Sequence, residues 1–156
     1  MRVEQVMTGT PAYCAATANL GEAVELLWNR NCGFLPVVDE EKKVVGVVTD
    51  RDVCVALGTR NKLAGELKVG EVATRAVISC EPDDEVGAAL ATMAEARVRR
   101  LPVIDKQGRL AGVLSLDDIV MHTRAGKLAK AAGLSSEEVV GILNKVYRPN
   151  LPALVH

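Results

Sequence analysis

Two short polar motifs are the strongest candidates for chemistry in this sequence. Thr49 precedes Asp52 by three residues, and Ser115 precedes Asp118 by the same spacing. A carboxylate beside a hydroxyl can accept hydrogen bonds from the donor groups of a ligand. The same spacing at the start of an apolar helix also forms a capping box, which contributes about 0.5–2 kcal/mol without any ligand. Both interpretations are open, and they are compatible, because the hydroxyl can cap while the carboxylate faces outward.

The two motifs belong to an internal duplication. Each follows an apolar segment of the same design, Leu35-Pro36-Val37-Val38-Asp39 in one half and Leu101-Pro102-Val103-Ile104-Asp105 in the other. The differences Pro102 minus Pro36, Gly112 minus Gly46 and Asp118 minus Asp52 are each 66. A fixed offset without gaps indicates that the function lies in what the two copies form together.

The apolar periodicity predicts the elements that position these motifs. Helical spacing at Leu20, Ala23, Val24, Leu27 and Trp28 predicts a helix over 20–29, and the β-branched runs predict strands. We expect a strand, helix, strand, strand, helix order in each copy, which is a mixed α+β fold of two β-α-β-β-α repeats. The expected boundaries are repeat 1 at 1–58, a polar linker at 59–70, repeat 2 at 71–124 and a C-terminal helical extension at 125–156.

Several finer expectations follow from the same patterns. Residues 77–80 should repeat the short first strand, and Trp28 and Phe34 should lie in the core. In the C-terminal extension, a predicted helix carries an apolar face that needs a cover, and we expect a homodimer to supply it. This face comprises Val139, Val140, Leu143 and Val146.

Composition excludes several classes of function. The net charge of −1, from 19 basic and 20 acidic residues, provides no global attraction to nucleic acid or to an anionic membrane. We find neither a signal peptide nor a membrane-spanning run, so we expect a cytoplasmic protein. The four cysteines form no C-x-x-C pair, and neither His122 nor His156 lies in a repeated segment. We therefore expect no metal site, no catalytic residue and no enzymatic activity.

The repeated segments resemble a tandem pair of cystathionine β-synthase (CBS) domains, the Bateman module. The resemblance covers residues 3 to about 123 and rests on an ordered set of motifs that occurs twice. In the first copy these are Val-x-x-Val-Met-Thr at 3–8, Leu-Pro-Val-Val-Asp at 35–39 and Gly-Val-Val-Thr-Asp-Arg-Asp at 46–52. The resemblance implies two units that face each other across a pseudo-twofold axis, with ligand clefts between their sheets.

The resemblance also implies roles for individual residues. In this family the pattern Gly-x-x-[Ser/Thr]-x-x-[Asp/Asn] places a hydroxyl and a carboxylate at the cleft, where the carboxylate accepts from ribose hydroxyls. The implied residues are Thr49, Asp52, Ser115 and Asp118. The resemblance further places basic residues before the second strand against nucleotide phosphates, which implies Arg99 and Arg100. The alternative is that Arg97, Arg99 and Arg100 form a solvated edge.

The first copy has no basic pair at this position. Gly33 and Phe34 stand there, so either Arg51 substitutes or only a nucleoside-like ligand fits. By the same resemblance, the loop before the first helix of one copy lines the site of the other. That implies residues 13–19 for the second-copy site and residues 79–85 for the first.

We therefore expect a regulatory module that binds an adenosine-containing ligand and signals occupancy to a partner or across a homodimer. AMP, ADP, ATP and S-adenosylmethionine all fit the pattern, because it addresses mainly the ribose, and no cofactor is required. The sequence identifies no protein partner. One alternative is an interaction scaffold with vestigial clefts, and another is a thiol redox switch built on Cys14 and Cys80, which occupy equivalent positions.

Overall fold

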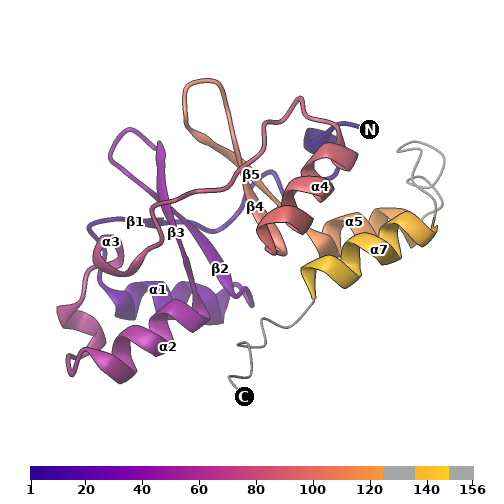
Figure 1. The fold of residues 1–156 in the computed structure, drawn as a ribbon. Coiled ribbons are helices and arrows are strands. Elements are labelled where there is room, and N and C mark those ends of the chain that lie inside the picture. The colour runs from indigo at the N-terminus through magenta and orange to yellow at the C-terminus, as the bar shows by residue number, and fades with distance from the viewer. Residues whose placement is uncertain (125–135, 148–156) are drawn as a thin grey trace, which may run out of the picture.

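Repeat 1 has the predicted order of strand, helix, strand, strand and helix (Figure 1). The computed structural model describes residues 1–124 and 136–147. The elements of repeat 1 are β1 (Cys14–Ala15), α1 (Leu20–Asn29), β2 (Phe34–Val38), β3 (Val44–Thr49) and α2 (Asp50–Thr59). β1 runs parallel to β2, and β2 runs antiparallel to β3. α1 begins where the Asn19 side chain accepts a hydrogen bond from the Glu22 backbone N–H at 3.1 Å, a standard N-cap.

Repeat 2 has the same helices and hairpin but almost no first strand. Its elements are α4 (Val86–Ala96), β4 (Arg100–Ile104), β5 (Leu110–Ser115) and α5 (Leu116–Arg124). The strand expected at 77–80 is reduced to one parallel bridge between Cys80 and Val103. The mixed α+β fold is confirmed, with two small sheets that differ in their edge strand.

Each repeat is completed by a segment that the sequence places elsewhere. The 3-10 turn η1 (Val3–Gln5) precedes repeat 1, but it packs Val3 into the core of repeat 2. Thr8 then pairs with Val113 of β5. In Figure 1 the N-terminus accordingly lies beside α4. We call residues 1–12 the crossed segment.

The connection between the repeats, which leads into repeat 2, packs against repeat 1. Leu67 follows η2 (Ala64–Glu66), and Val69 is the first residue of α3 (Val69–Val72). Both are fully buried in the core of repeat 1. Thr74 then pairs with Val47 of β3. The polar composition of 59–70 gave no sign of this packing.

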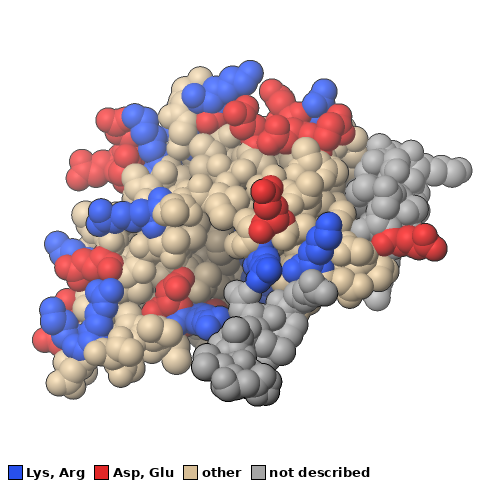
Figure 2. Space-filling view, viewed as in Figure 1, with Lys and Arg blue, Asp and Glu red and all other residues tan. Residues whose placement is uncertain are grey.

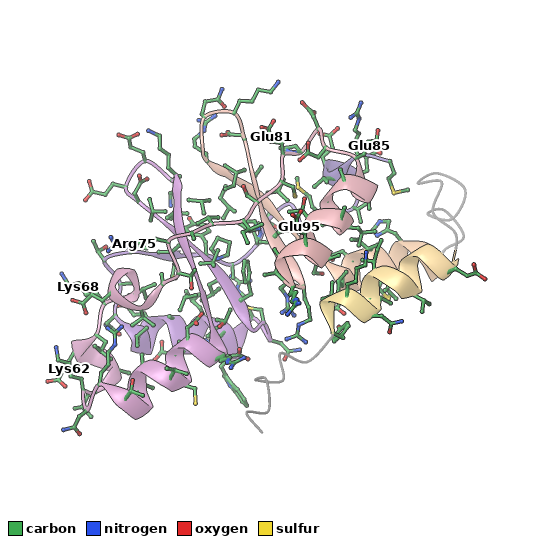
Figure 3. All side chains as sticks on the ribbon, viewed as in Figure 1. Lys62, Lys68, Arg75, Glu81, Glu85 and Glu95 are labelled. Carbon is green, nitrogen blue, oxygen red and sulfur yellow. The ribbon has the colours of Figure 1, made fainter. Side chains whose placement is uncertain are left out.

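The chain between α2 and α4 passes from repeat 1 to repeat 2, and its labelled charged side chains show this course. In Figure 3, Lys62 and Lys68 lie beside repeat 1, while Glu81 and Glu85 lie beside repeat 2. Glu85 binds the N-terminal ammonium at 3.0 Å, and this ammonium keeps the pKa of Glu85 below its ordinary value. The crossed segment is thus held to repeat 2 at its first residue.

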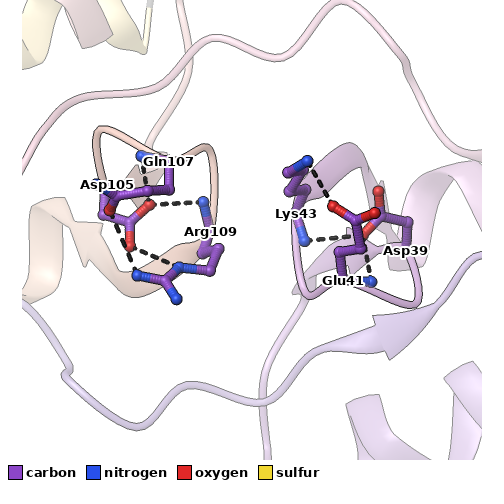
Figure 4. Close-up of polar contacts among 6 residues, drawn as sticks. All are labelled: Asp39, Glu41, Lys43, Asp105, Gln107 and Arg109. Carbon is purple, nitrogen blue, oxygen red and sulfur yellow. Dashed lines mark hydrogen bonds and ion pairs between the residues drawn. The ribbon is translucent and has the colours of Figure 1, made fainter.

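Each hairpin turn is held by its own polar contacts (Figure 4), and backbone hydrogen bonds join one hairpin to the other. Asp39 accepts backbone hydrogen bonds within its own turn, and Asp105 does the same in the other hairpin. The Val44 N–H then donates to the Gly108 carbonyl at 3.0 Å, which joins the two turns. The Arg109 backbone N–H is the main reason that the pKa of Asp105 lies below its ordinary value.

The C-terminal helix α7 (Ser136–Val146) covers repeat 2. It lies alongside α4 and α5 in Figure 1. Val146 is buried, and Ile142 and Leu143 pack against the same core, whereas Val140 is 54% exposed. The expectation that this apolar face needs a second copy of the chain is therefore wrong for Leu143 and Val146, since α4 of the same chain covers them.

The outer face of repeat 1 is more exposed than its sequence predicts. Leu20, Ala23 and Leu27 of α1 are buried as expected, but Val24 is 39% exposed and Trp28 is 84% exposed. The assignment of Trp28 to the core is therefore wrong, because the apolar stripe of α1 is wider than the surface it packs on. Among residues 1–124 and 136–147, no helix is long and apolar enough to cross a bilayer.

The crossed segment packs so close to β5 that it leaves no room for a side chain at Gly112. A Cβ at this position would lie 2.6 Å from Met7 Sδ and 2.8 Å from the Thr8 carbonyl oxygen. Gly112→Ala should therefore lower the free energy of unfolding by about 1–3 kcal/mol in urea titrations. Gly87→Ala in α4 is the matched control, since nothing lies within 4 Å of that Cβ. Equal stability of the two variants would contradict the role given to the crossed segment.

Candidate functional site

The first candidate site is a cavity of about 290 Å³ between the repeats, which we call the Asp118 cavity. Three parts of the chain build its wall. Repeat 2 supplies Arg100, Ser115 and Asp118, repeat 1 supplies Arg30, Cys32 and Phe34, and the crossed segment supplies Thr8, Thr10, Pro11 and Ala12. Polar groups from both repeats therefore converge on one concave pocket that is partly open to solvent, as in many ligand sites.

The Ser115 and Asp118 side chains form the capping box of α5. Asp118 Oδ2 accepts hydrogen bonds from the Ser115 backbone N–H at 2.9 Å and from the Ser115 hydroxyl at 2.6 Å. The Asp118 N–H donates back to Ser115 Oγ at 3.1 Å. Both bonds to the carboxylate end on Oδ2, so Oδ1 is the oxygen that can accept from a ligand. The capping interpretation holds, and the geometry is compatible with ligand binding as well.

The second candidate site has a volume of about 630 Å³, and we call it the Arg51 cavity. Repeat 1 lines it with Gly33, Phe34, Thr49, Asp50 and Arg51, and repeat 2 lines it with the run 97–100, which contains three arginines. Val146 and Tyr147 from the end of α7 complete the wall. Figure 2 shows basic side chains gathered where the two repeats meet beside α7. Four arginines against one aspartate make this lining strongly cationic.

Asp52 repeats the geometry of Asp118 but not its surroundings. Its Oδ2 accepts from the Thr49 N–H at 2.9 Å and from the Thr49 hydroxyl at 2.7 Å, which forms the capping box of α2. Thr49 lines the Arg51 cavity, but Asp52 lines neither of the two cavities. Of the two carboxylates that the sequence singles out, Asp118 is the one at a cavity wall.

The arginine pair is divided between the two cavities. Arg100 lines both of them, and its guanidinium lies 3.9 Å from Asp117. Arg99 lines only the Arg51 cavity, together with Thr49 and Arg51 of the opposite repeat. The sequence suggested that Arg99 would accompany Ser115 and Asp118, and the structure does not bring these three together.

Sequence reasoning missed Arg30, which lines the Asp118 cavity from the C-terminal end of α1. The duplication could not reveal it, because the residue 66 positions later is Ala96. The segment 13–19 was also misplaced. Its Tyr13 lines a separate hollow, where the Lys42 ammonium donates to the Tyr13 hydroxyl at 2.7 Å. The residues of this region that reach the Asp118 cavity come just before it, at positions 8–12.

Comparison with known families decides the identity of the two repeats. The family model described as the CBS domain matches residues 3–59 and again residues 69–124. The chain belongs to the CBS domain family. The two repeats are thus a CBS pair, and the resemblance seen in the sequence is confirmed.

Relatives of this CBS pair include small proteins and parts of larger ones. It is 33% identical over 132 residues to the uncharacterized protein YlbB of Bacillus subtilis, covering 84% of this chain and 88% of YlbB. It is 37% identical over 111 residues to inosine-5'-monophosphate dehydrogenase of Methanocaldococcus jannaschii, covering 71% of this chain but only 21% of that enzyme. The second match therefore concerns a minor portion of the enzyme.

Two solved structures with the same fold contain adenosine compounds. The CBS domain pair of protein MJ0100, in complex with 5'-methylthioadenosine and S-adenosyl-L-methionine, matches with a TM-score of 0.71 and 28% identity, over 81% of this chain and 98% of that one. CBSX2 in complex with AMP matches with a TM-score of 0.71 and 27% identity, also over 81% and 98% of the two chains.

The cysteine environments bear on the redox hypothesis. Burial raises the pKa of the Cys14 thiol from its ordinary 9.0 to about 11. Burial and the negative charge of Asp84 raise the pKa of Cys80 to about 12. The reactive species in redox chemistry is the thiolate. Both thiols of the equivalent pair are therefore protonated at neutral pH, which weighs against a switch built on them.

Alkylation can test this conclusion. Iodoacetamide at pH 8 should reach Cys14 and Cys80 only after unfolding, because both side chains are buried. The free energy of unfolding should also fall as the pH rises above 9.0, because the unfolded thiols then lose protons that the folded thiols keep. Mass spectrometry of the labelled peptides gives the order of reaction. Rapid labelling of Cys14 and Cys80 in the folded protein would contradict the conclusion.

Proposed function

We propose that this CBS pair is a regulatory module that binds an adenosine-containing nucleotide between its repeats and signals occupancy to a partner or across a homodimer. The observation that carries the proposal is the Asp118 cavity. There, one carboxylate and two guanidinium groups from opposite repeats line the same volume. The proposal includes a cytoplasmic location and no catalytic role, since we assign no activated nucleophile or acid–base pair to the cavity.

The lining of the Asp118 cavity suits a ribose phosphate. A carboxylate can accept hydrogen bonds from both hydroxyls of a cis-diol, and Oδ1 of Asp118 is the atom for this role. Arg30 and Arg100 supply planar donor groups for a phosphate. Phe34, Cys32 and Pro11 supply apolar wall for a base. The complexes of MJ0100 and CBSX2 with adenosine compounds support an adenosine moiety as the common element.

The two cavities suit ligands of different charge. The Asp118 cavity is small and has two arginines in its lining, which favours a monophosphate such as AMP. The Arg51 cavity is larger and has four, which favours a polyphosphate such as ADP or ATP. S-adenosylmethionine carries a positive sulfonium group, so the arginines disfavour it in the Arg51 cavity. We rank AMP first for the Asp118 cavity.

A short segment joins both cavities to the outer helices. Cys32 lines the Asp118 cavity, Gly33 lines the Arg51 cavity, and both also line a groove on the outer face of repeat 1. Asn31, in the same segment, has a left-handed backbone with φ 47°. A shift of this segment on ligand binding would change the groove directly. This continuity is the physical route that we propose for signalling.

The groove itself is the surface that we propose for the homodimer. Trp28, Leu27 and Leu57 line it, with Asp50 as its one charged residue. The corresponding face of repeat 2 is covered by α7, so that Leu90 is 1% exposed while its counterpart Val24 is 39% exposed. An apolar face with few charges can pack against its own copy without electrostatic repulsion. A twofold contact would bury Trp28, a residue type common at interface centres.

A nucleotide-binding test compares the two capping carboxylates. Asp118→Asn should keep the cap of α5, because an amide oxygen can accept the same bonds, but it removes the charged acceptor for ribose. Its affinity for AMP should fall about 10-fold to 100-fold by calorimetry, from the roughly 1.5–3 kcal/mol of a charged hydrogen bond. Asp52→Asn is the matched control and should leave AMP affinity within about twofold. AMP should also slow alkylation of Cys32, which lines the Asp118 cavity.

Two outcomes would contradict this proposal. One is the failure of AMP, ATP and S-adenosylmethionine to bind a nucleotide-free preparation. The other is equal loss of affinity in the two variants. If the chain dimerises through the groove while neither cavity binds a nucleotide, the scaffold alternative gains support.

The dimer surface has its own test. Trp28→Glu should weaken self-association at least 30-fold, since truncation of a central interface residue commonly costs about 2 kcal/mol or more. Sedimentation velocity across a concentration series measures the change. Met121→Glu on α5 is the control, because Met121 is 63% exposed but lies outside the groove. A Trp28→Glu variant that dimerises like the wild type would show that the interface lies elsewhere.

A further inference from the structure

The end of α7 belongs to the wall of the Arg51 cavity, although α7 lies outside both CBS repeats. The family match ends at residue 124, whereas Val146 and Tyr147 line this cavity. Val146 is 7% exposed and anchors the helix end in the core of repeat 2. The Tyr147 N–H donates to the Leu143 carbonyl at 2.9 Å, so Tyr147 is still part of the helical turn.

Tyr147 contacts one of the cavity's arginines through its ring. The Arg99 guanidinium carbon lies 5.8 Å from the Tyr147 ring centroid, within the range of a cation–π interaction. The backbone of Arg99 is also fixed, because its carbonyl accepts from the Leu116 N–H at 3.0 Å. The backbone of Arg99 is thus held at the start of α5, and its guanidinium lies against the ring at the end of α7.

Contact with one aromatic ring does not use all the donors of a guanidinium. The guanidinium carbon of Arg99 lies over the Tyr147 ring, and the group carries five N–H donors, so donors remain for the oxygens of an anion. Arg51, Arg97 and Arg100 share this lining with Arg99. The opposing carboxylates are Asp50 in the lining and Asp117, 3.9 Å from Arg100, so positive charge is in excess and the cavity attracts a polyanion. Ordering Arg99 in advance reduces the entropy that an anion must remove on binding.

We propose that Tyr147 is a positioning residue of a polyphosphate site in the Arg51 cavity, and that phosphate binding there is coupled to the docking of α7 on repeat 2. The proposal rests on the proposed function for the nucleotide, but its core is the shared chemistry of phosphate oxygens. ATP and inorganic tripolyphosphate both carry that chemistry. By thermodynamic reciprocity, if docked α7 with Tyr147 raises the affinity for an anion, then binding of that anion must stabilise the docked position of α7.

Calorimetry on the full chain tests the positioning role. Tyr147→Ala should weaken ATP and tripolyphosphate about two- to fivefold, the range of an exposed cation–π contact. Tyr147→Phe keeps the ring and should restore wild-type affinity. Tyr13→Ala is the matched control, because Tyr13 also pairs with a cation, the Lys42 ammonium 4.5 Å from its ring centroid, but lines a different hollow.

Hydrogen exchange of residues 136–147 supplies a readout that a purely structural role would not change. ATP and tripolyphosphate should slow exchange in α7, adenosine should not, and Arg99→Ala should abolish the effect. The inference is overturned if ATP binds Tyr147→Ala as tightly as the wild type, or if the anion leaves hydrogen exchange in α7 unchanged. In either case the nucleotide function stands. If only tripolyphosphate binds, with dependence on Tyr147, the inference stands and the adenosine assignment fails.

Discussion

The exchange of segments between the repeats is the interaction on which the rest of the structure depends. Thr8 pairs with Val113 of β5, and Thr74 pairs with Val47 of β3, so each sheet is extended by the chain that leads into the other repeat. Val3 is fully buried in one core, as Leu67 is in the other. Neither repeat can complete its core alone. The space between them is consequently lined from both sides, which is why each candidate site combines residues from two repeats.

This crossing changes how the differences between the copies must be interpreted. Within one repeat, Gly33 and Phe34 replace the arginine pair, which suggested that either Arg51 substitutes for it or only a nucleoside-like ligand fits. Across the interface, Arg99 instead faces Thr49 and Arg51 of the first copy. Arg30 reaches the second-copy cavity in the same way. Each cavity is therefore lined by basic residues of both repeats, so a count of charges within one repeat misjudges both cavities.

The sequence predicted what depends on local pattern and on repetition. The order of elements in repeat 1, the bounds of α1 and the Ser115–Asp118 motif at the start of α5 all follow from periodicity and capping chemistry, which act within a few residues. The burial of Leu67, the exposure of Trp28 and the contribution of Arg30 to a cavity depend on which surfaces meet. No local pattern carries that information, and α7 added a contact that has no counterpart in repeat 1.

Helix α7 covers repeat 2 and, in the part of the chain that the structure describes, has no counterpart on repeat 1, so different segments of the chain adjoin the two cavities. On repeat 2, α7 covers the helices and brings Tyr147 to the Arg51 cavity. On repeat 1, the equivalent face stays open, and Cys32 connects it to the Asp118 cavity. A ligand in the Asp118 cavity would thus contact the segment beside the proposed dimer surface, and a ligand in the Arg51 cavity would also contact the end of a helix outside the duplication. The asymmetry between the repeats therefore places different segments at the walls of the two related cavities.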